Sequence, residues 1–251
     1  MLATLTIDNH LATLTLNRPE ARNALSPEML GDMHAAVEEL AAVAETGAAR
    51  AAVLVGAGKA FCAGMDLRAV IDDPAAPPKL LASLAEFTLK LRALPVPTVA
   101  KVVGGAIGGG CGLACVCDFA ITHPEAKLGY PEVDLGVCPA VVAPWLIKKI
   151  GAGPARRVLL EGGTMPGDRA AAIGLVTRCV PMADLDAAVK ELTDRLLAAG
   201  PHAVRATKRW LNTLDGSDDA AAVRRGAMIS AEVVGSPETR AALKARFAKG
   251  L

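Results

Sequence analysis

The chain has few aromatic residues and almost no excess of either charge. Aromatic residues make up 3% of its 251 residues, and 27 Lys and Arg side chains stand against 26 Asp and Glu side chains, for a net charge of +1. Proteins that bind nucleic acid usually gather basic residues on one face and stack bases on aromatic side chains. The composition therefore argues against a nucleic-acid partner.

Long apolar runs are missing as well. A membrane-spanning helix needs about 20 apolar residues in succession, and the nearest run, Val99 to Val116, is broken by Lys101 and by several glycines. The first residues, Met1 to Asp8, alternate apolar and polar side chains and lack the basic and apolar segments of a secretory signal. We therefore expect a cytoplasmic protein without a membrane partner.

The chain also lacks His and Cys residues at the spacing of a metal site. The four histidines are scattered, and the six cysteines do not form the paired ligands of a zinc site. Cys111 and Cys115 are four residues apart in a run of small residues, where a thiol usually packs as a compact apolar group. We therefore predict packing roles for the cysteines and no bound metal.

Apolar residues, at 52% of the chain, are sufficient for the core of one large domain with an appendage. Alternation over Leu2–Ile7 and Leu11–Leu16 predicts a hairpin. Ser26, followed by Pro27 and Glu28, is typical of a helix start, and the apolar spacing extends that helix to about Gly47.

Further along, buried strands and helices alternate, which indicates the α/β class. We expect strands at Ala51–Val55, Thr98–Val103 and Phe119–Thr122, a surface loop at Asp72–Pro78, a glycine loop at Gly104–Gly110, and helices at Lys79–Leu94 and Cys111–Cys117. From Pro139 the chain is expected to be almost entirely helical, with helices at Pro181–Ala199, Pro201–Leu214, Asp218–Val234 and Pro237–Ala248.

A unit of buried strand, glycine turn and helix occurs twice, in Val53–Val70 and in Val99–Cys115. Such turns leave backbone N–H groups pointing outward at a helix N-terminus, and two of them side by side would bind an oxyanion. Phosphate-binding motifs do not fit, because Leu113 interrupts Gly-x-Gly-x-x-Gly and Ala60 follows Gly58-Lys59. Close packing of helix on strand is the remaining alternative explanation for the glycines.

Four segments in order carry a resemblance to a known family. They are Asn17–Leu25, Phe61–Asp66, Gly105–Cys111 and Tyr130–Gly136. They resemble the signature motifs of the enoyl-CoA hydratase/isomerase (crotonase) superfamily, and the resemblance covers nearly the whole chain. It implies a ββα spiral core over residues 1–190 and an all-helical region over residues 191–251 that assembles subunits into trimers or pairs of trimers.

The resemblance also implies roles for single residues. The N–H groups of Met65 and Gly109 would bind a thioester oxygen, and Glu132 would transfer protons. No separate cofactor is implied, because coenzyme A is part of the acyl-CoA substrate. Implied substrate or CoA contacts are Arg22, Ala24, Ala63, Gly64, Asp66, Leu67, Tyr130 and Pro139, with Arg22 or Lys59 as phosphate contacts. Acyl-pocket candidates by position are Met65, Val70, Leu84, Phe87, Tyr130, Val137, Pro139 and Trp145.

One departure from the family pattern bears on the reaction. Hydratases of the family carry two catalytic glutamates, but Gly112 stands at the first position and only Glu132 remains. Asp134 would point to the opposite side of an extended backbone, and Asp118 lies at a helix end, where it would cap or form a salt bridge. Glu132 itself is either an exposed loop carboxylate or a buried acid–base group with a raised pKa.

We predict an enoyl-CoA hydratase, because a bacterial subgroup of similar sequence, the methylglutaconyl-CoA hydratases, also has glycine at this position. That similarity suggests a branched acyl group. The alternative is a Δ3,Δ2-enoyl-CoA isomerase, for which a single glutamate is sufficient. Other chemistry of the family, such as decarboxylation, and a catalytically silent CoA-binding scaffold remain open.

Overall fold

The structure, a computed structural model, describes residues 1–73 and 75–248. Its larger sheet has six strands in the order β1-β2-β3-β4-β6-β9. The β1–β2 pair is the predicted antiparallel hairpin, and the other neighbouring strands are parallel. These strands are β1 Ala3–Asp8, β2 Leu11–Leu16, β3 Ala51–Gly56, β4 Thr98–Lys101, β6 Phe119–Thr122 and β9 Arg178–Cys179.

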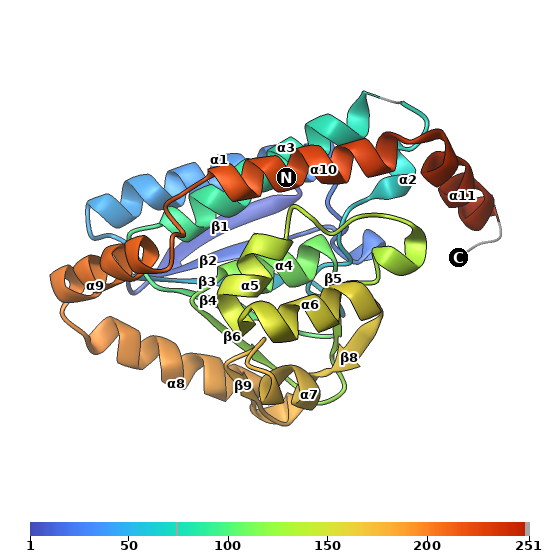
Figure 1. Cartoon of the computed structure of the whole chain (residues 1–251). Helices are drawn as coiled ribbons and strands as arrows, with labels where there is room; N and C mark the ends of the chain where they lie inside the picture. The colour runs from blue at the N-terminus through green and yellow to red at the C-terminus, as the bar shows by residue number, and fades with distance from the viewer. Residues whose placement is uncertain (74, 249–251) are drawn as a thin grey trace.

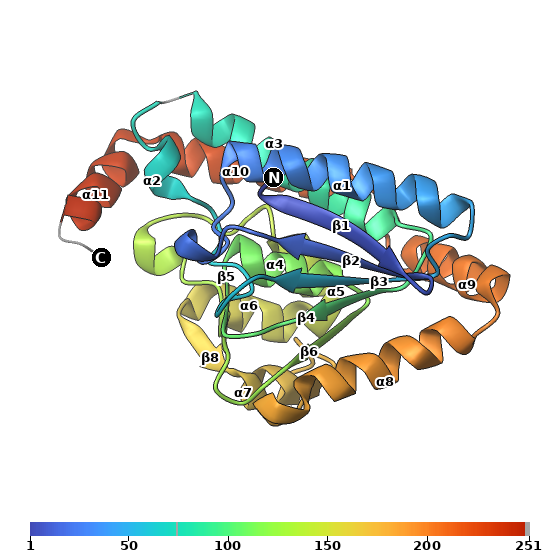
Figure 2. The same cartoon turned by 180° about the vertical axis from the view of Figure 1, so that it is seen from behind.

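Helices cover both faces of this sheet (Figures 1 and 2). Successive strand residues face opposite sides, so Leu54 belongs to the main core with α1 (Pro27–Glu45) and α3 (Ala76–Ala93), whereas Val53 packs toward α8 (Leu185–Ala198). The alternation of strands and covering helices confirms the predicted α/β class.

The first helix begins as predicted. Ser26 Oγ accepts a hydrogen bond from the Met29 N–H at 3.2 Å, and Pro27 occupies the first helical position. The prediction for α3 was wrong at its start, because the helix begins at Ala76 and shortens the expected loop. Pro77 and Pro78 fit in the first turn, where a missing N–H removes no helical hydrogen bond. Pro74 of that loop lies outside the described residues.

A second, three-stranded sheet was not predicted. It has the order β5-β7-β8, and its strands are β5 Gly105–Ile107, β7 Lys127–Gly129 and β8 Thr164–Pro166. The expected glycine loop at Gly104–Gly110 therefore contains a strand, and the segment after Pro139, predicted to be almost entirely helical, contributes β8 and β9. Strands of two or three residues are too short to show a period in the sequence, and their hydrogen-bond partners are distant along the chain.

The remaining elements are short turns and helices, most of them in the second half of the chain. They are η1 Pro19–Ala21, α2 Leu67–Val70, α4 Gly109–Val116, η2 Val133–Leu135, α5 Ala143–Ile150, α6 Ala152–Glu161, α7 Gly167–Ala172, η3 Met182–Asp184, α9 Pro201–Leu214, α10 Ala221–Gly235 and α11 Pro237–Ala248. Across the described residues, no helix is both long and apolar enough to cross a membrane.

The C-terminal helices fold back over the core (Figure 1). Helix α10 runs along α3, and Arg224 of α10 forms two hydrogen bonds with Glu86 of α3, at 2.7 and 3.1 Å. The several helices after residue 190 agree with the predicted helical C-terminal region. The division into two parts at residue 190, which falls within α8, stays a prediction.

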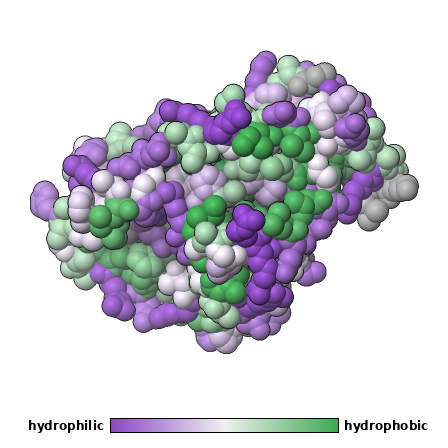
Figure 3. Space-filling model, viewed as in Figure 1, coloured by the Kyte–Doolittle hydropathy of each residue, from purple (hydrophilic) through white to green (hydrophobic). Residues whose placement is uncertain are grey.

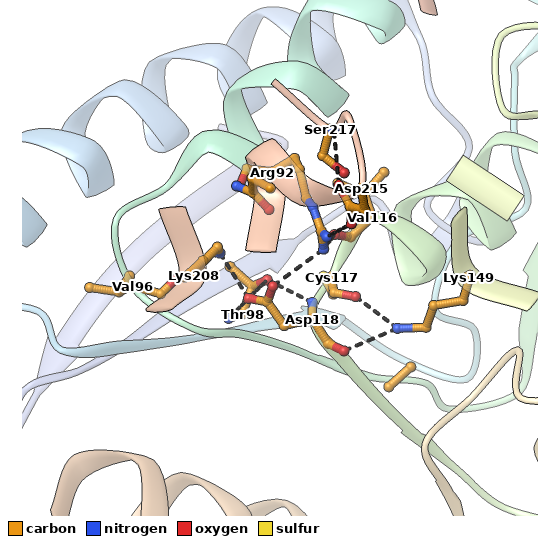
Figure 4. A network of polar contacts seen from close by, with 12 residues as sticks. Arg92, Val96, Thr98, Val116, Cys117, Asp118, Lys149, Lys208, Asp215 and Ser217 are labelled. Atoms are coloured by element: carbon orange, nitrogen blue, oxygen red, sulfur yellow. Dashed lines mark hydrogen bonds and ion pairs between the residues drawn. The ribbon is translucent and has the colours of Figure 1, made fainter. Parts of the chain in front are cut away.

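A buried network of charges lies beyond the C-terminal end of α4 (Figure 4). One Asp118 oxygen accepts hydrogen bonds from the Thr98 N–H and from Lys208 Nζ, both at 2.8 Å, and the other lies 3.3 Å from Arg92 Nη1. Burial alone would raise the pKa of Asp118, but the Lys208 ammonium and the Thr98 N–H hold that pKa below its usual value. The expected capping or salt-bridge role of Asp118 is thus confirmed.

Lys149 of α5 extends the network to the carbonyl groups at the end of α4. Its Nζ donates to the carbonyl oxygens of Cys117 and Asp118, at 3.0 and 3.1 Å. A cation at the C-terminal end of a helix satisfies its unpaired carbonyl groups and its partial negative charge. This end of α4 is therefore fixed to α3, α5 and α9.

Candidate active site

The segment Asn17–Leu25 supports the loop that follows β3. The Asn23 side chain is fully buried and donates hydrogen bonds to the carbonyl oxygens of Ala57, Ala60 and Phe61, at 3.0, 2.8 and 3.2 Å. A buried amide that meets three carbonyl groups holds that backbone in a single conformation. The resemblance in this segment thus corresponds to a structural support.

Four of the predicted CoA contacts, Arg22, Ala24, Ala63 and Asp66, take part in the same support. The guanidinium group of Arg18 lies 2.7 Å from Asp66 Oδ2 and 3.2 Å from the Ala24 carbonyl oxygen, and the Arg22 carbonyl oxygen accepts the Ala63 N–H at 2.9 Å. Sequence reasoning missed Arg18, because its pairing with a residue 48 positions away is visible only after folding. The Arg22 and Lys59 side chains are both exposed.

The loop after β3 directs the Met65 N–H toward a cavity. Gly64 has φ = 85°, and a Cβ there would lie 2.6 Å from the Ile107 carbonyl oxygen, so only glycine fits. The loop pairs with Leu25 through the Gly64 carbonyl and the Asp66 N–H. The intervening Met65 N–H therefore points away from Leu25, and it donates to no acceptor within residues 1–73 and 75–248.

A second backbone donor stands at the start of α4. Gly109 is the first residue of this helix, and the N–H groups of a first helical turn have no acceptor inside the helix. A Cβ on Gly64 would lie 3.5 Å from the Gly109 nitrogen, so the two glycine turns are in contact. The predicted juxtaposition of Met65 and Gly109 is therefore present in the fold.

Pairing between β5 and β7 brings Glu132 to the same place. These strands are parallel, with Ile107 opposite Gly129, and the Gly108 N–H donates to the Gly129 carbonyl oxygen at 2.8 Å. The carboxyl ends of parallel strands meet at one edge, so the chain after β7 lies beside the start of α4. A Cβ on Gly108, where φ is 53°, would lie only 2.6 Å from Glu132 Oε1.

The Glu132 carboxyl group is largely buried, and one of its two oxygens has no polar partner. Its Oε2 atom is inaccessible to solvent and has no hydrogen-bond partner among the described residues. Burial raises the pKa of Glu132 to about 7, although a hydrogen bond to its own backbone acts in the opposite direction. Such a group gives up and accepts a proton at neutral pH, which fits the acid–base interpretation rather than that of an exposed loop carboxylate.

Val142 fills the space beside Gly112, the position at which the resemblance implies a first glutamate. A Cβ on Gly112 would lie 2.5 Å from Val142 Cγ1. Asp134 does not replace the missing carboxylate, because its Oδ2 accepts the Gly163 N–H at 2.8 Å and it does not line the cavity. Among the described lining residues, Glu132 is the only carboxylate.

These parts surround a cavity of about 80 Å³. Its wall carries no basic side chain among the described residues, and apart from Glu132 and Cys138 it is apolar or backbone. The lining residues are Ala63, Gly64, Met65, Leu67, Leu81, Leu84, Ile107, Gly108, Gly109, Pro131, Glu132, Leu135, Val137, Cys138, Pro139 and Val141. The predicted residues in this set are Ala63, Gly64, Met65, Leu67, Leu84, Gly109, Glu132, Val137 and Pro139. The predicted contacts Arg22, Ala24 and Asp66 do not line the cavity, and the side chain of the candidate Val70 lies outside the described part.

Three aromatic candidates lie in the core and do not line the cavity. Tyr130 is fully buried with its hydroxyl 3.3 Å from Cys115 Sγ, Trp145 donates from Nε1 to Thr88 Oγ1 at 3.0 Å, and Phe87 is also fully buried. Buried Tyr and Trp need a partner for their polar atom, and α3 and α4 supply it. The pocket is lined instead by aliphatic residues whose positions depend on tertiary packing.

Known proteins of one family are similar to this chain over most of its length. The sequence profile described as enoyl-CoA hydratase/isomerase matches residues 6–244. A putative enoyl-CoA hydratase of Thermus thermophilus is 36% identical over 244 residues, covering 96% of this chain and 95% of that protein. A crotonyl-CoA hydratase of Syntrophomonas wolfei is 35% identical over 208 residues, covering 82% and 79%.

Solved structures agree with the sequence relatives. The crystal structure of an enoyl-CoA hydratase/isomerase from Xanthobacter autotrophicus Py2 matches with a TM-score of 0.87 and 31% identity, over 99% of this chain and 97% of that one. Fold and cavity define an enzyme of the crotonase-like α/β class. The chain belongs to the enoyl-CoA hydratase/isomerase family.

Proposed function

We propose that this enzyme hydrates an enoyl-CoA thioester, with Glu132 as its proton-transferring group. The observation that carries the proposal is the buried Glu132 carboxyl group, whose Oε2 has no hydrogen-bond partner among the described residues. It lies next to the glycine turns of Met65 and Gly109, whose N–H groups have no acceptor within the described chain. Coenzyme A enters as part of the substrate, and the proposal requires no separate cofactor. The predicted cytoplasmic location stays a prediction.

In the proposed reaction, the thioester carbonyl oxygen accepts hydrogen bonds from the Met65 and Gly109 N–H groups. The Glu132 carboxylate takes a proton from water while the water oxygen bonds to C3. The electron pair of the C2–C3 double bond moves into the thioester as an enolate, which the two N–H groups stabilise. Protonated Glu132 then gives its proton to C2, which yields a 3-hydroxyacyl thioester and restores the carboxylate.

Isomerisation of a 3-enoyl to a 2-enoyl thioester is the second candidate. The contact of Val142 with Gly112 favours it, because this contact leaves Glu132 as the only carboxylate among the described lining residues. Glu132 would take a proton from C2, which gives a dienolate held by the same two N–H groups, and would return the proton to C4. The relatives named as crotonyl-CoA hydratase and putative enoyl-CoA hydratase support hydration as the first choice.

The lining supports an uncharged acyl group. A free carboxylate, as in methylglutaconyl-CoA, would be buried beside Glu132 with no basic side chain among the described lining residues. Burial of a charge without a partner costs about 3 kcal/mol or more. The expected branched, methylglutaconyl-like substrate therefore gains no support from the cavity, and we propose a short, uncharged enoyl group instead.

Proton NMR in D₂O with purified enzyme tests these alternatives. Crotonyl-CoA, 3-hexenoyl-CoA and 3-methylglutaconyl-CoA would be followed separately. We expect a 3-hydroxyacyl product from crotonyl-CoA, with deuterium at C2. Conversion of the 3-hexenoyl to the 2-hexenoyl thioester without any hydration would identify an isomerase, and preference for 3-methylglutaconyl-CoA would contradict the uncharged acyl group.

We also propose that the chain forms a homotrimer or a pair of trimers through its helical C-terminal region. Trp210, Leu211 and Leu214 of α9 are 61%, 53% and 62% exposed, and hydrophobic surface is visible at the α9 end of the molecule (Figure 3). Large apolar side chains grouped on one helix usually face a partner surface. A second copy of this chain is the partner proposed here.

A further inference from the structure

The last helix, α11, packs behind one wall of the cavity. Leu243 of α11 is fully buried and belongs to an apolar cluster with Ile71, Val137 and Val234. The partly buried Leu67, Leu135 and Phe247 pack against this cluster. In Figure 1, α11 lies beside α2 and the turn that contains η2. The cluster is separate from the main core, which contains α1 and α3.

Polar contacts from α11 reach the chain segment that follows Met65. Arg240 donates from Nη2 to the Ile71 carbonyl oxygen at 2.9 Å, and Lys244 Nζ lies 2.7 Å from Asp72 Oδ1. The Arg68 guanidinium stands over the Phe247 ring, 5.2 Å from its centroid. This segment leads directly out of the first donor loop, so α11 fixes where that loop continues.

Other contacts from α11 reach the segment that follows Glu132. Thr239 Oγ1 donates to the Gly136 carbonyl oxygen at 3.3 Å, and Arg246 donates from Nη1 to the Asp134 carbonyl oxygen, also at 3.3 Å. One helix therefore holds both segments that leave the site, one after Met65 and one after Glu132.

Three residues belong both to the cavity lining and to the α11 cluster: Leu67, Leu135 and Val137. The wall between the cavity and Leu243 is thus a single layer of side chains. Protein interiors are close-packed, so a layer that packs on a buried cluster can move into the space left when a leucine of that cluster is shortened. The position of Leu243 is therefore transmitted to the size of the cavity.

We infer that α11, through Leu243, determines the length of acyl chain that the enzyme accepts. The inference rests on the proposed function only in that the cavity receives the acyl group. The layer of Leu67, Leu135 and Val137 bounds the cavity on this side, so an acyl chain that extends toward it needs the layer to move outward. Leu243 blocks that movement from behind.

The test compares wild type with Leu243→Ala, which removes three carbon atoms behind the wall. The first readout is the ratio of kcat/KM for 2-octenoyl-CoA to kcat/KM for crotonyl-CoA. We expect this ratio to rise at least about tenfold, because each methylene accepted by an apolar pocket changes selectivity by about tenfold or more. A ratio within about twofold of wild type overturns the inference.

The second readout does not depend on catalysis. The Kd values of octanoyl-CoA and butyryl-CoA are measured by calorimetry. The ratio of the Kd of butyryl-CoA to the Kd of octanoyl-CoA should rise in Leu243→Ala, in parallel with the kcat/KM ratio. If the wild type hydrates neither enoyl thioester while this ratio of Kd values still shifts, the proposed hydratase fails and the role of α11 stands. If crotonyl-CoA is hydrated but neither ratio shifts, the role of α11 fails alone.

Two further variants keep the test decisive. Leu160→Ala on α6 is the matched control, because Leu160 is 70% exposed and does not line the cavity, and it should leave both ratios unchanged. If Leu243→Ala does not fold, Leu243→Val removes a single carbon atom and should raise the kcat/KM ratio by about twofold to fourfold. No rise in a folded Leu243→Val overturns the inference.

Discussion

Among the described residues that line the cavity, only Glu132 carries a carboxyl group. Its burial raises its pKa to about 7, compared with an ordinary 4.5. The folded protein therefore binds a proton more tightly than the unfolded chain. Between these two pKa values the folded state holds more protons, so this group makes stability fall as pH rises through that window.

Glu132→Gln should remove this pH dependence. Above the folded pKa the wild type carries a buried, unpartnered charge, so the variant should be more stable there by up to about 3 kcal/mol. The difference should disappear as pH falls toward the ordinary pKa of a glutamate. Chemical denaturation at several pH values measures it. An exposed control, Glu39→Gln, should stay within about 0.5 kcal/mol of wild type throughout, and equal stability of Glu132→Gln and wild type at high pH would contradict the burial described here.

Gly108 sets the position of that carboxyl group. In Gly108→Ala the new Cβ would meet Glu132 Oε1 and the backbone would be strained at φ = 53°. We expect kcat to fall by about 10² or more, because a displaced acid–base group loses its geometry. Gly105→Ala is the matched control: its Cβ would meet only Ile107 Cγ1, at an ordinary 3.8 Å, and it should keep nearly full activity. Equal kcat in both variants would refute the contact.

Among elements, α4 links the proposed catalytic site to the buried charge network. Its N-terminus presents the Gly109 N–H, and the chain that leaves its C-terminus is held by Asp118 through Lys208 and Arg92. The acidic group is buried together with the cations around it. Removing its charge leaves Arg92 with Asp215 but leaves Lys208 without an acidic partner among the described residues. The two ends of one eight-residue helix therefore carry different functions.

Asp118→Asn should destabilise the protein by about 3–5 kcal/mol at neutral pH, because it leaves the buried Lys208 ammonium uncompensated. The pKa of Asp118 is depressed, so its contribution is present above the unfolded pKa and is lost as pH falls through the folded value. The difference between variant and wild type should shrink in acid. Asp186→Asn, an identical change at a side chain that is 82% exposed in its pair with Lys101, should cost less than about 1 kcal/mol. A similar loss in both variants contradicts the account.

The helices and strands that the sequence predicts correctly are those with a local signal in the sequence. Ser26 and Pro27 mark the start of α1, and the apolar run at Ala51–Val55 marks β3. The three strands that align Glu132 with Gly109 have three residues each and show no periodicity. They form only because distant backbone groups pair, so the local sequence at Gly104–Gly110 predicts a loop and not a strand.

The site also combines residues that sequence motifs predict with contacts that only the folded chain shows. Met65, Gly109 and Glu132 were identified from motifs, and the fold brings them together. The contact of Val142 with Gly112 and the pairing of Arg18 with Asp66 join residues far apart in sequence, and no local pattern indicates them. Aromatic candidates such as Tyr130 were assigned to the pocket by proximity in sequence, although burial of the ring in the core is the more favourable arrangement.

At the scale of the whole molecule, the exposed apolar face of α9 predicts self-association. Light scattering of the wild type should give three or six times the mass of one chain. Leu214→Glu places a charge on that face and should shift the enzyme toward monomers, since burying an unpaired charge in an interface is costly. The matched control Leu160→Glu, on the exposed face of α6, should keep the assembly. A stable wild-type monomer would contradict the proposed trimer.

The proposed reaction depends on proton transfer by Glu132. The most direct test is kcat for hydration of crotonyl-CoA by Glu132→Gln, with binding of butyryl-CoA measured alongside. The account predicts that kcat falls by about 10²–10⁴ while the Kd of butyryl-CoA changes less than about threefold. A variant that keeps kcat within about tenfold of wild type would contradict the claim, and would leave the buried carboxyl group without a catalytic role.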